Sequence, residues 1–298
     1  MKVQRKMPVS RKTKSNGLSI YNPETVAQYF DDYGLREWER LTQTPSDEAS
    51  LHVHTHYLEK HISKGRHVLE IGAGAGRFTQ ILAGLGAHIV VADISQGQLE
   101  LNKHFASELG FDQAVIDRRQ ADICDLSQFE PNSFDCVVAY GGPFGYVLDQ
   151  RDQALSECIR VLRPGGLLLL SVASLWGSAH GRLDGVLLST PIAANQKITS
   201  TGDLSPATFP ERRGNFMHMF RAGELMEWLK RRKLKLVDIS ASNCLSLTWN
   251  QMLKEIRNDA DKWNELLRME LEACAEDGCL DMGLHLIAVA RKPKRKVL

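Results

Sequence analysis

Short apolar runs alternate with longer amphipathic segments between about residue 67 and residue 174. The apolar runs have the length of buried strands, and they cover residues 67–71, 87–92, 116–121, 134–139 and 167–171. The segments between them have a helical period, and they cover residues 77–84, 95–109 and 151–162. Strands that alternate with helices predict βαβ units and a parallel sheet with helices on both faces. The pattern therefore predicts an α/β, three-layer sandwich of the Rossmann-like kind.

The flanking segments have other patterns. Residues 20–66 contain two helical stretches, which we expect to form an N-terminal cap on the domain of residues 67–298. Residues 1–19 are basic and polar, and they are predicted to be a disordered tail. Near the C-terminus the pattern predicts helices at 222–230 and 248–275 and strands at 235–240 and 284–290.

No clear period is present from about residue 175 to residue 219, where Gly, Ser, Thr and Pro are frequent. A loop of this length inside a compact domain is usually functional or mobile. Apolar pairs such as Leu187-Leu188 are too numerous for a simple linker. We therefore expect this insertion, together with the N-terminal helices, to cover a substrate.

Composition narrows the class of protein. The chain has 37 Lys and Arg against 36 Asp and Glu, so it lacks the large positive field of a dedicated nucleic-acid-binding protein. No apolar run approaches the roughly 20 residues that span a bilayer. The N-terminus has no apolar signal segment, so a cytoplasmic location is expected, with the six cysteines reduced.

A glycine-rich turn follows the first predicted strand. Its glycines are Gly72, Gly74 and Gly76, and Glu70 lies at the strand end. Glycine allows a tight turn and a close approach of the backbone to a ligand. The dinucleotide fingerprint needs a third glycine where this chain has Arg77, and a carboxylate here would repel a pyrophosphate. The turn therefore favours a ligand with a positive charge near Glu70, and it argues against NAD.

Two further carboxylates follow the next two strands. Asp93 ends the second strand, where a carboxylate accepts hydrogen bonds from both hydroxyls of a ribose. Asp122 and Ile123 end the third strand, where they suit the exocyclic amine and the ring of an adenine. Open α/β sheets bind ligands at the carboxyl ends of their strands. Together these positions predict a nucleoside site along that edge.

The segments 70–76, 134–140 and 160–166, with Asp93 and Asp122, resemble the successive motifs of class I S-adenosylmethionine-dependent methyltransferases. The resemblance is closest to the ubiquinone and menaquinone methyltransferases and many small-molecule methyltransferases, and it covers about residues 67–174. It implies a seven-stranded, mostly parallel sheet of order 3-2-1-4-5-7-6, and S-adenosylmethionine as cofactor. The residues expected to bind the cofactor are Glu70, Gly72, Gly74, Gly76, Asp93, Ile94, Gln98, Asp122, Ile123 and Tyr140.

The acceptor of the methyl group is weakly specified. Amino-group methyltransferases of nucleic acids and glutamine resemble one another in an Asn/Asp-Pro-Pro-aromatic motif, and residues 140–144 read Tyr-Gly-Gly-Pro-Phe instead. A small-molecule acceptor is therefore expected. Tyr33, Trp38 and Tyr146 are the substrate-site candidates, and His180 and His218 are the candidate bases.

Several alternatives stay open at this point. His52 and His56 share one helix face, but no third ligand is evident, so no metal is predicted and the histidines of this helix are interpreted as polar positions. The chain could also be a cofactor-binding partner or regulator without turnover, or a methyltransferase of RNA or protein. The oligomeric state and the methylated atom, whether oxygen, nitrogen or carbon, are not defined by the sequence.

Overall fold

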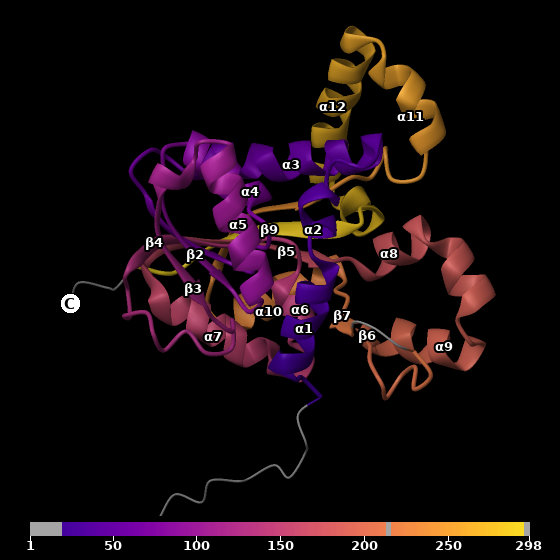
Figure 1. Ribbon diagram of the computed structural model, residues 1–298. Coiled ribbons are helices and arrows are strands. Elements are labelled where there is room, and N and C mark those ends of the chain that lie inside the picture. Colours follow the sequence, from indigo (N-terminus) through magenta and orange to yellow (C-terminus); the bar gives the residue numbers. More distant parts are fainter. Residues whose placement is uncertain (1–19, 213–215, 295–298) are drawn as a thin grey trace, which may run out of the picture.

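A seven-stranded sheet forms the centre of the computed structural model, which describes residues 20–212 and 216–294 (Figure 1). The strand order is β3-β2-β1-β4-β5-β9-β8, and β9 is antiparallel to both of its neighbours. This confirms the predicted sheet order, in which the last strand lies between the fifth and the sixth. The strands are β1 (His67–Ile71), β2 (His88–Asp93), β3 (Val115–Gln120), β4 (Phe134–Ala139), β5 (Leu162–Ala173), β8 (Lys235–Ala241) and β9 (His285–Arg291).

Helices cover both faces of the sheet and divide the core in two. Alternate residues of each strand face opposite layers, so Leu69 and Val137 pack on one side while Val68 and Cys136 pack on the other. The first layer contains α6 (Pro143–Tyr146), α7 (Arg151–Val161) and α10 (Ala222–Arg231). The second layer contains α3 (Pro45–His61), α4 (Arg77–Gly84), α5 (Gln96–Glu108) and α12 (Ala260–Ala275).

Two short N-terminal helices, α1 (Pro23–Tyr33) and α2 (Arg36–Glu39), lie across the carboxyl ends of the strands. Asn22 caps α1, because its side chain accepts a hydrogen bond from the Thr25 amide, and Pro23 occupies the first turn. Asp31 of α1 in turn accepts hydrogen bonds from Ser95 Oγ and from the Gly97 amide at the start of α5. α1 is therefore tied to the edge of the sheet at which β2 ends. The predicted basic tail, residues 1–19, lies outside the described residues.

The insertion differs from its expected lack of secondary structure. It contains α8 (Leu175–Gly181), a π-helical turn (Gly185–Ser189), α9 (Ile192–Thr201) and a small hairpin of β6 (Asp203–Leu204) and β7 (Met217–His218). These elements are short, and only Leu175, Ile198 and Met219 form their small buried cluster. A few buried positions in short elements leave no detectable period, which is why the sequence pattern missed them.

One further boundary was wrong. The predicted helix 248–275 is two helices, α11 (Asn250–Arg257) and α12, which are separated at Asn258 and Asp259. The Asp259 side chain caps α12 by accepting hydrogen bonds from the amides of Asp261 and Lys262. No helix in the described part of the chain is long and apolar enough to cross a membrane.

Candidate cofactor and acceptor site

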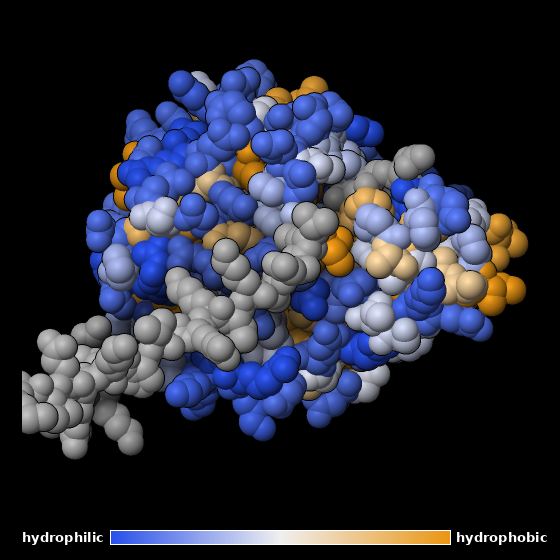
Figure 2. Space-filling view, turned by 90° about the horizontal axis from the view of Figure 1, so that it is seen from below, coloured by the Kyte–Doolittle hydropathy of each residue, from blue (hydrophilic) through white to orange (hydrophobic). Residues whose placement is uncertain are grey.

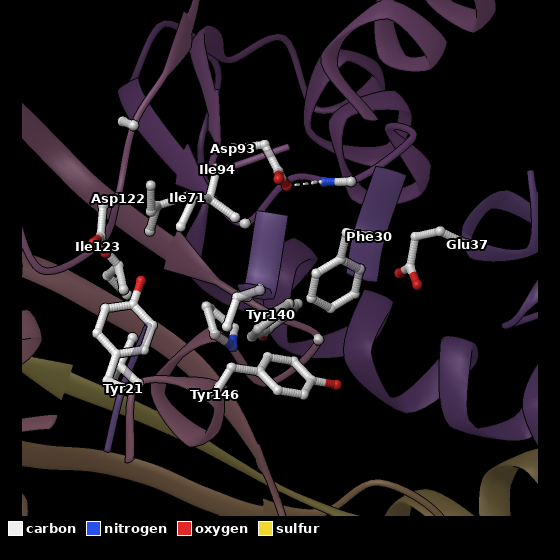
Figure 3. Close-up of a pocket in the computed structure, with 17 residues that line it drawn as sticks. Tyr21, Phe30, Glu37, Ile71, Asp93, Ile94, Asp122, Ile123, Tyr140 and Tyr146 are labelled. Atoms are coloured by element: carbon white, nitrogen blue, oxygen red, sulfur yellow. Dashed lines mark hydrogen bonds between the residues drawn. The ribbon is translucent and has the colours of Figure 1, made fainter. Parts of the chain in front are cut away.

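A pocket of about 570 Å³ opens at the carboxyl ends of β1 to β4, beneath α1 and α2 (Figure 3). The sheet contributes the floor, and the N-terminal segment contributes the opposite wall through Tyr21, Phe30 and Glu37. Of the residues predicted to bind the cofactor, seven line the pocket: Gly72, Gly74, Asp93, Ile94, Asp122, Ile123 and Tyr140.

The glycine turn brings backbone to the surface of the pocket. Gly72 and Gly74 have φ angles of 71° and 54°, in the left-handed region that favours glycine. A Cβ atom at Gly72 would lie 3.1 Å from Pro143 Cβ, and one at Gly74 would lie 3.0 Å from Glu37 Cγ. Side chains at either position would therefore crowd the pocket walls, whereas glycine leaves room for a ligand against the backbone.

Asp93 is almost fully buried at the end of β2. Its two carboxylate oxygens accept hydrogen bonds from the Gly74 amide and from the Ser95 amide, each at 2.8 Å. Burial raises the pKa of Asp93 to about 6, and Glu37 across the pocket adds to this effect. Each oxygen keeps a further lone pair, so the carboxylate has the capacity to accept hydrogen bonds from a bound diol.

Asp122 lies after β3 at the other end of the pocket. Tyr21 faces it in Figure 3, and the two side chains form a hydrogen bond that contributes, after burial, to raising the pKa of the tyrosine. Asp122 also accepts a hydrogen bond from the Cys124 amide at 2.8 Å. Ile123 and Ala121 supply apolar surface beside the carboxylate. A carboxylate next to apolar surface suits a flat heterocycle that carries an amino group.

Glu70 does not line the pocket. Its side chain is buried behind the glycine turn, where Oε2 accepts a hydrogen bond from Thr79 Oγ1 at 2.7 Å. Burial raises the pKa of Glu70 to about 8, with a smaller contribution from Asp93. In this conformation the residue holds α4 against β1, and its carboxyl group does not face the pocket.

Two other predicted cofactor residues support the site from outside. Gly76 is the N-cap of α4 with a φ of 101°, and a Cβ atom there would lie 2.8 Å from Asn102 Nδ2. The buried Gln98 donates hydrogen bonds from Nε2 to the carbonyl oxygens of Phe30 and Gly34. Gln98 therefore anchors α1, the helix that forms the outer wall.

The three substrate-site candidates have different surroundings. Tyr146 lines the pocket, and its ring centroid lies 5.2 Å from that of Phe30. Tyr33 stacks on Tyr29 outside the pocket. Trp38 stacks on Phe105 with 4.0 Å between ring centroids, and the Arg77 guanidinium covers its other face. Trp38 thus locks α2 onto α4 and α5 and does not line the pocket.

Neither predicted base is placed to accept a proton in the pocket. His218 is buried, with Nδ1 2.7 Å from Asp203 Oδ1 and Nε2 2.8 Å from Glu224 Oε1. Although burial opposes its charge, these two carboxylates raise the pKa of His218. Carboxylates accept and do not donate, so both ring nitrogens carry protons and no lone pair is left. His180 is exposed on α8 and is not among the residues that line the pocket.

Sequence reasoning missed the wall formed by Tyr21 and Glu37 and misinterpreted His54. His54 is only 1% exposed, so it is not a polar surface position of α3. A detectable signal was present, because His54 belongs to the buried i, i+4 stripe of Ser50, His54 and Leu58 on that helix. The N-terminal helices were expected over the site, but the sequence does not indicate that Tyr21 and Glu37 are the side chains that face the pocket, since this depends on the tertiary fold.

One group of potential metal ligands exists among the described residues, formed by Cys244, Glu270 and Cys274. Both oxygens of Glu270 already accept hydrogen bonds, from the amides of Cys244, Leu245 and Ser246. Glu270 therefore fixes the loop after β8 to α12, and we interpret the group as part of the core.

Comparisons with known proteins agree with this geometry. A family model described as a methyltransferase domain matches residues 69–170, which contain the glycine turn, Asp93 and Asp122. A demethylmenaquinone methyltransferase of Clavibacter sepedonicus is 38% identical over 36% of this chain and 40% of its own length. A ubiquinone biosynthesis O-methyltransferase of Hahella chejuensis is 26% identical over 65% of this chain and 71% of its own length. The chain thus matches less than half of the first of these relatives.

Solved structures share the fold at low identity. The [4+2]-cyclase SpnF superposes with a TM-score of 0.58 at 18% identity, covering 92% of this chain and 97% of that one. A putative methyltransferase bound to the Haloferax volcanii activator Trm112 gives a TM-score of 0.59 at 16% identity, covering 92% and 100%. The methyltransferase domain matched over residues 69–170 and the pocket at the strand ends together support a class I S-adenosylmethionine-dependent methyltransferase, with S-adenosylmethionine as the cofactor.

Proposed function

We propose that this protein transfers the methyl group of S-adenosylmethionine to a small-molecule acceptor. The observation that carries the proposal is the placement of two carboxylates, Asp93 and Asp122, at the two ends of one pocket floored by the glycine turn. This spacing provides one acceptor for a ribose and another for an adenine amine. The sulfonium methyl group of the cofactor is itself a good electrophile, so the main task of the protein is to bind and orient the cofactor and the acceptor.

Individual residues would bind different parts of the cofactor. Asp93 accepts the ribose hydroxyls, and Gly72 and Gly74 allow the amino-acid end of the cofactor to lie along the turn. Glu37 lies across from this turn and offers a carboxylate to an ammonium group. Tyr21 now satisfies Asp122, so we expect its hydroxyl to yield that hydrogen bond to the adenine amine.

The acceptor would enter beside Tyr146, on the side of the pocket opposite Asp93 (Figure 3). This side lies near the insertion, since a Cβ atom at Gly145 would be 2.9 Å from the carbonyl oxygen of His218. The names of the relatives, a demethylmenaquinone methyltransferase and a ubiquinone biosynthesis O-methyltransferase, support a small-molecule acceptor. Holding the acceptor atom in line with the methyl group at near-attack distance accounts for much of the rate in such a reaction.

Calorimetry and product analysis test the proposal. S-adenosylmethionine and S-adenosylhomocysteine should bind the full chain at micromolar concentration, and NAD should not. With a metabolite extract and cofactor labelled in its methyl group, mass spectrometry should find the label in a molecule of low mass. Binding without any labelled product would favour a regulatory cofactor-binding protein, and label in RNA or protein would replace the small-molecule acceptor. Preference for NAD would overturn the cofactor assignment.

A further inference from the structure

A buried network of ion pairs lies outside the cofactor pocket and joins the insertion to the rest of the domain. His218 of β7 is at its centre: Nδ1 lies 2.7 Å from Asp203 Oδ1 on β6, and Nε2 lies 2.8 Å from Glu224 Oε1 on α10. Arg151, the first residue of α7, places Nη1 3.6 Å from Asp203 Oδ1. Residues from β6, β7, α7 and α10 therefore meet at one imidazole ring that is only 1% exposed.

Both contacts of His218 require a protonated ring. A neutral imidazole has one N–H group and one lone pair, so with a carboxylate at each nitrogen the lone pair would face a carboxylate oxygen. The charged groups around the ring are Asp203 from β6, Glu224 from α10 and Arg151 from α7. Although burial lowers the His218 pKa and Arg151 acts in the same direction, the two carboxylates outweigh both and raise this pKa above its ordinary value of 6.5. The protonated ring balances the charge of the network, whereas the neutral ring leaves one negative charge in excess.

The hairpin of β6 and β7 depends on this ring. The two strands pair over only two residues each, and so short a ladder contributes little stability of its own. Gly202, directly before β6, has a φ of 81° and packs against the imidazole, because a Cβ atom there would lie 2.8 Å from His218 Cε1. The Phe220 ring covers another side, with 4.5 Å between the two ring centroids. The imidazole therefore fills the space between the hairpin and the domain, and its two hydrogen bonds fix the hairpin in place.

β7 packs directly against α6, which forms part of the pocket wall (Figure 1). A Cβ atom at Gly145 would lie 2.9 Å from the His218 carbonyl oxygen, so no side chain separates the two backbones. Tyr146, the next residue, lines the pocket and packs edge-on against Phe30 of α1. Because the contact is made between backbones, a displacement of β7 changes the position of Tyr146.

Arg151 provides a second link between the network and this wall. Its Nη1 also donates a hydrogen bond of 2.7 Å to the carbonyl oxygen of Leu148, two residues after Tyr146. Leu148 is buried with a φ of 44°, a left-handed conformation that costs a non-glycine residue free energy and persists only where contacts hold it. Tyr146 therefore lies between two points at which the network holds the chain, Gly145 and Leu148.

Building on the proposed function, we propose that protonated His218 is a positioning residue for the acceptor side of the pocket. It holds the β6–β7 hairpin against α10 and α7, and through the backbone contact at Gly145 it keeps Tyr146 in place. Loss of the proton leaves one carboxylate without a donor and releases the hairpin, so the acceptor side loosens while the cofactor pocket at the strand ends stays formed. Since the fold raises the His218 pKa, this contribution is complete just below pH 6.5 and is lost as the pH rises through the raised value.

Nuclear magnetic resonance of the histidine ring nitrogens tests the protonation state. The chain has ten histidines, and the His218 signals are identified by their through-space contact with the Phe220 ring. At pH 7 both ring nitrogens of His218 should carry protons. Glu224→Gln replaces a charge-assisted hydrogen bond by a neutral one, and it should move the His218 titration to lower pH by about one unit. Glu227→Gln, exposed on the same helix, is the matched control and should leave the titration unchanged. A neutral His218 ring at pH 7 would overturn the proposal.

Amide hydrogen exchange tests the effect on the hairpin and on α6 without any acceptor. Exchange rates between pH 6 and pH 9.5 are divided by those of an unstructured chain, which removes the general effect of hydroxide. The protection of segments 202–204 and 217–220 should fall by roughly tenfold or more across the His218 titration, the loss expected for one hydrogen bond to a charged group. Segment 143–148 should lose protection with the same midpoint, and the amides of β4 should stay protected as an internal reference. Constant protection of the hairpin, or a loosened hairpin beside an unchanged segment 143–148, would refute the proposal.

Failure of this inference and failure of the proposed function are distinguishable, because neither measurement needs cofactor or acceptor. Calorimetry with S-adenosylhomocysteine should give affinities within a few-fold of the parent in both variants, since the residues of the network do not line the cofactor pocket. At saturating cofactor, transfer of label to the product found with the metabolite extract should decline about one pH unit lower in Glu224→Gln than in the parent. Identical pH profiles would refute the effect on the acceptor side. Absence of cofactor binding in the parent would refute the proposed function instead.

Discussion

Each carboxylate oxygen of Asp93 accepts a hydrogen bond from a backbone amide, and the same carboxylate is proposed to bind the cofactor. It joins the glycine turn to the start of α5 through the amides of Gly74 and Ser95. A carboxylate at a strand end ordinarily either caps a helix or binds a ligand. Here the same carboxylate also fixes the glycine turn that shapes the pocket. Removing it should therefore affect both cofactor affinity and the order of the turn.

Asp93→Ala removes charge-assisted hydrogen bonds worth ~1.5–3 kcal/mol. We expect the affinity for S-adenosylhomocysteine to fall about ten- to a hundredfold by the corresponding conversion. The two freed amides should also lower the free energy of unfolding by roughly 1–3 kcal/mol, since buried donors lose their partner. Calorimetry and denaturant unfolding measure the two effects. Asp261→Ala, at an exposed position of α12, is the control, and parent-like affinity in Asp93→Ala would show that Asp93 is only a cap.

Glu70 gives a pH-dependent signature. Its pKa is raised from 4.5 to about 8 in the folded protein, so the carboxyl binds a proton that the unfolded chain releases. Its contribution to stability is therefore complete below about pH 4.5 and is lost as the pH rises toward 8. Glutamine cannot ionise, so the variant Glu70→Gln should not lose stability in this way. In the parent, this carboxyl group lowers the free energy of unfolding by at most about 1.4 kcal/mol per pH unit.

Denaturant unfolding without cofactor at pH 6.5 and pH 8 checks this expectation. Asp93, whose pKa is raised only to about 6, contributes little to the slope in this window. The parent should lose stability between the two pH values, and Glu70→Gln should lose about 1–2 kcal/mol less by that slope. Glu108→Gln, at an exposed position of α5, should follow the parent. Identical pH dependence in parent and Glu70→Gln would mean that Glu70 is ionised in the fold.

Residue roles were predictable from the sequence where a strand end fixed them. Asp93, Asp122 and Ile123 line the pocket because parallel strands bring their carboxyl ends to one edge. Glu70 was expected to face the ligand, but strand alternation and the buried Thr79 contact turn it behind the glycine turn.

At the scale of elements, long periodic segments were predictable and short ones were not. The predicted bounds of β1, α4 and β4 agree with the structure, because each has a buried apolar pattern bounded by turn residues. β5 is longer than predicted, since it begins at Leu162 and passes through the turn-like residues before Leu167. The insertion escaped prediction, as its helices bury few side chains and are joined by glycines and prolines.

The tip of the insertion exposes apolar side chains over the π-helical turn and the start of α9, visible as orange surface in Figure 2. Leu187, Leu188 and Ile192 are 67%, 86% and 77% exposed. Surface of this kind marks a contact site for a ligand or a partner more often than a packing element. We expect it to help cover the acceptor when the site closes.

Replacing residues 183–195 by a short Gly-Ser link tests that role while keeping Arg182, Ile198 and Asp203. Methyl transfer should fall strongly, because closure excludes water and aligns the acceptor. Cofactor affinity should stay within a few-fold, because the cofactor pocket is formed by strand ends and by α1 and α2. Steady-state rates and calorimetry separate the two effects. Full activity in the shortened protein would exclude a covering role, and lost cofactor binding would place the segment in the cofactor site.

At the scale of the whole molecule, the pocket joins the N-terminal helices to the sheet, so a bound cofactor should stabilise both. A ligand at a hundred times its Kd stabilises the native state by about 2.7 kcal/mol. For a chain of this size, with an unfolding entropy of about 2.1 cal/mol/K per residue, that corresponds to a rise in Tm of roughly 4–5 °C. Differential scanning calorimetry should show this rise with S-adenosylhomocysteine and none with NAD. The same experiment on Asp93→Ala should show a much smaller rise in Tm. An equal rise would mean that Asp93 does not contribute to cofactor binding.

The position of β9 has a consequence for synthesis of the chain on the ribosome. β9 follows every other strand in the sequence, yet it pairs with β5 on one side and β8 on the other. Until residue 291 has left the exit tunnel, the nascent chain presents both of those strands as unpaired edges, and β5 carries the apolar run of residues 167–170. Open apolar edges recruit other chains. The emerging polypeptide should therefore depend on chaperone protection until its final strand closes the sheet from within.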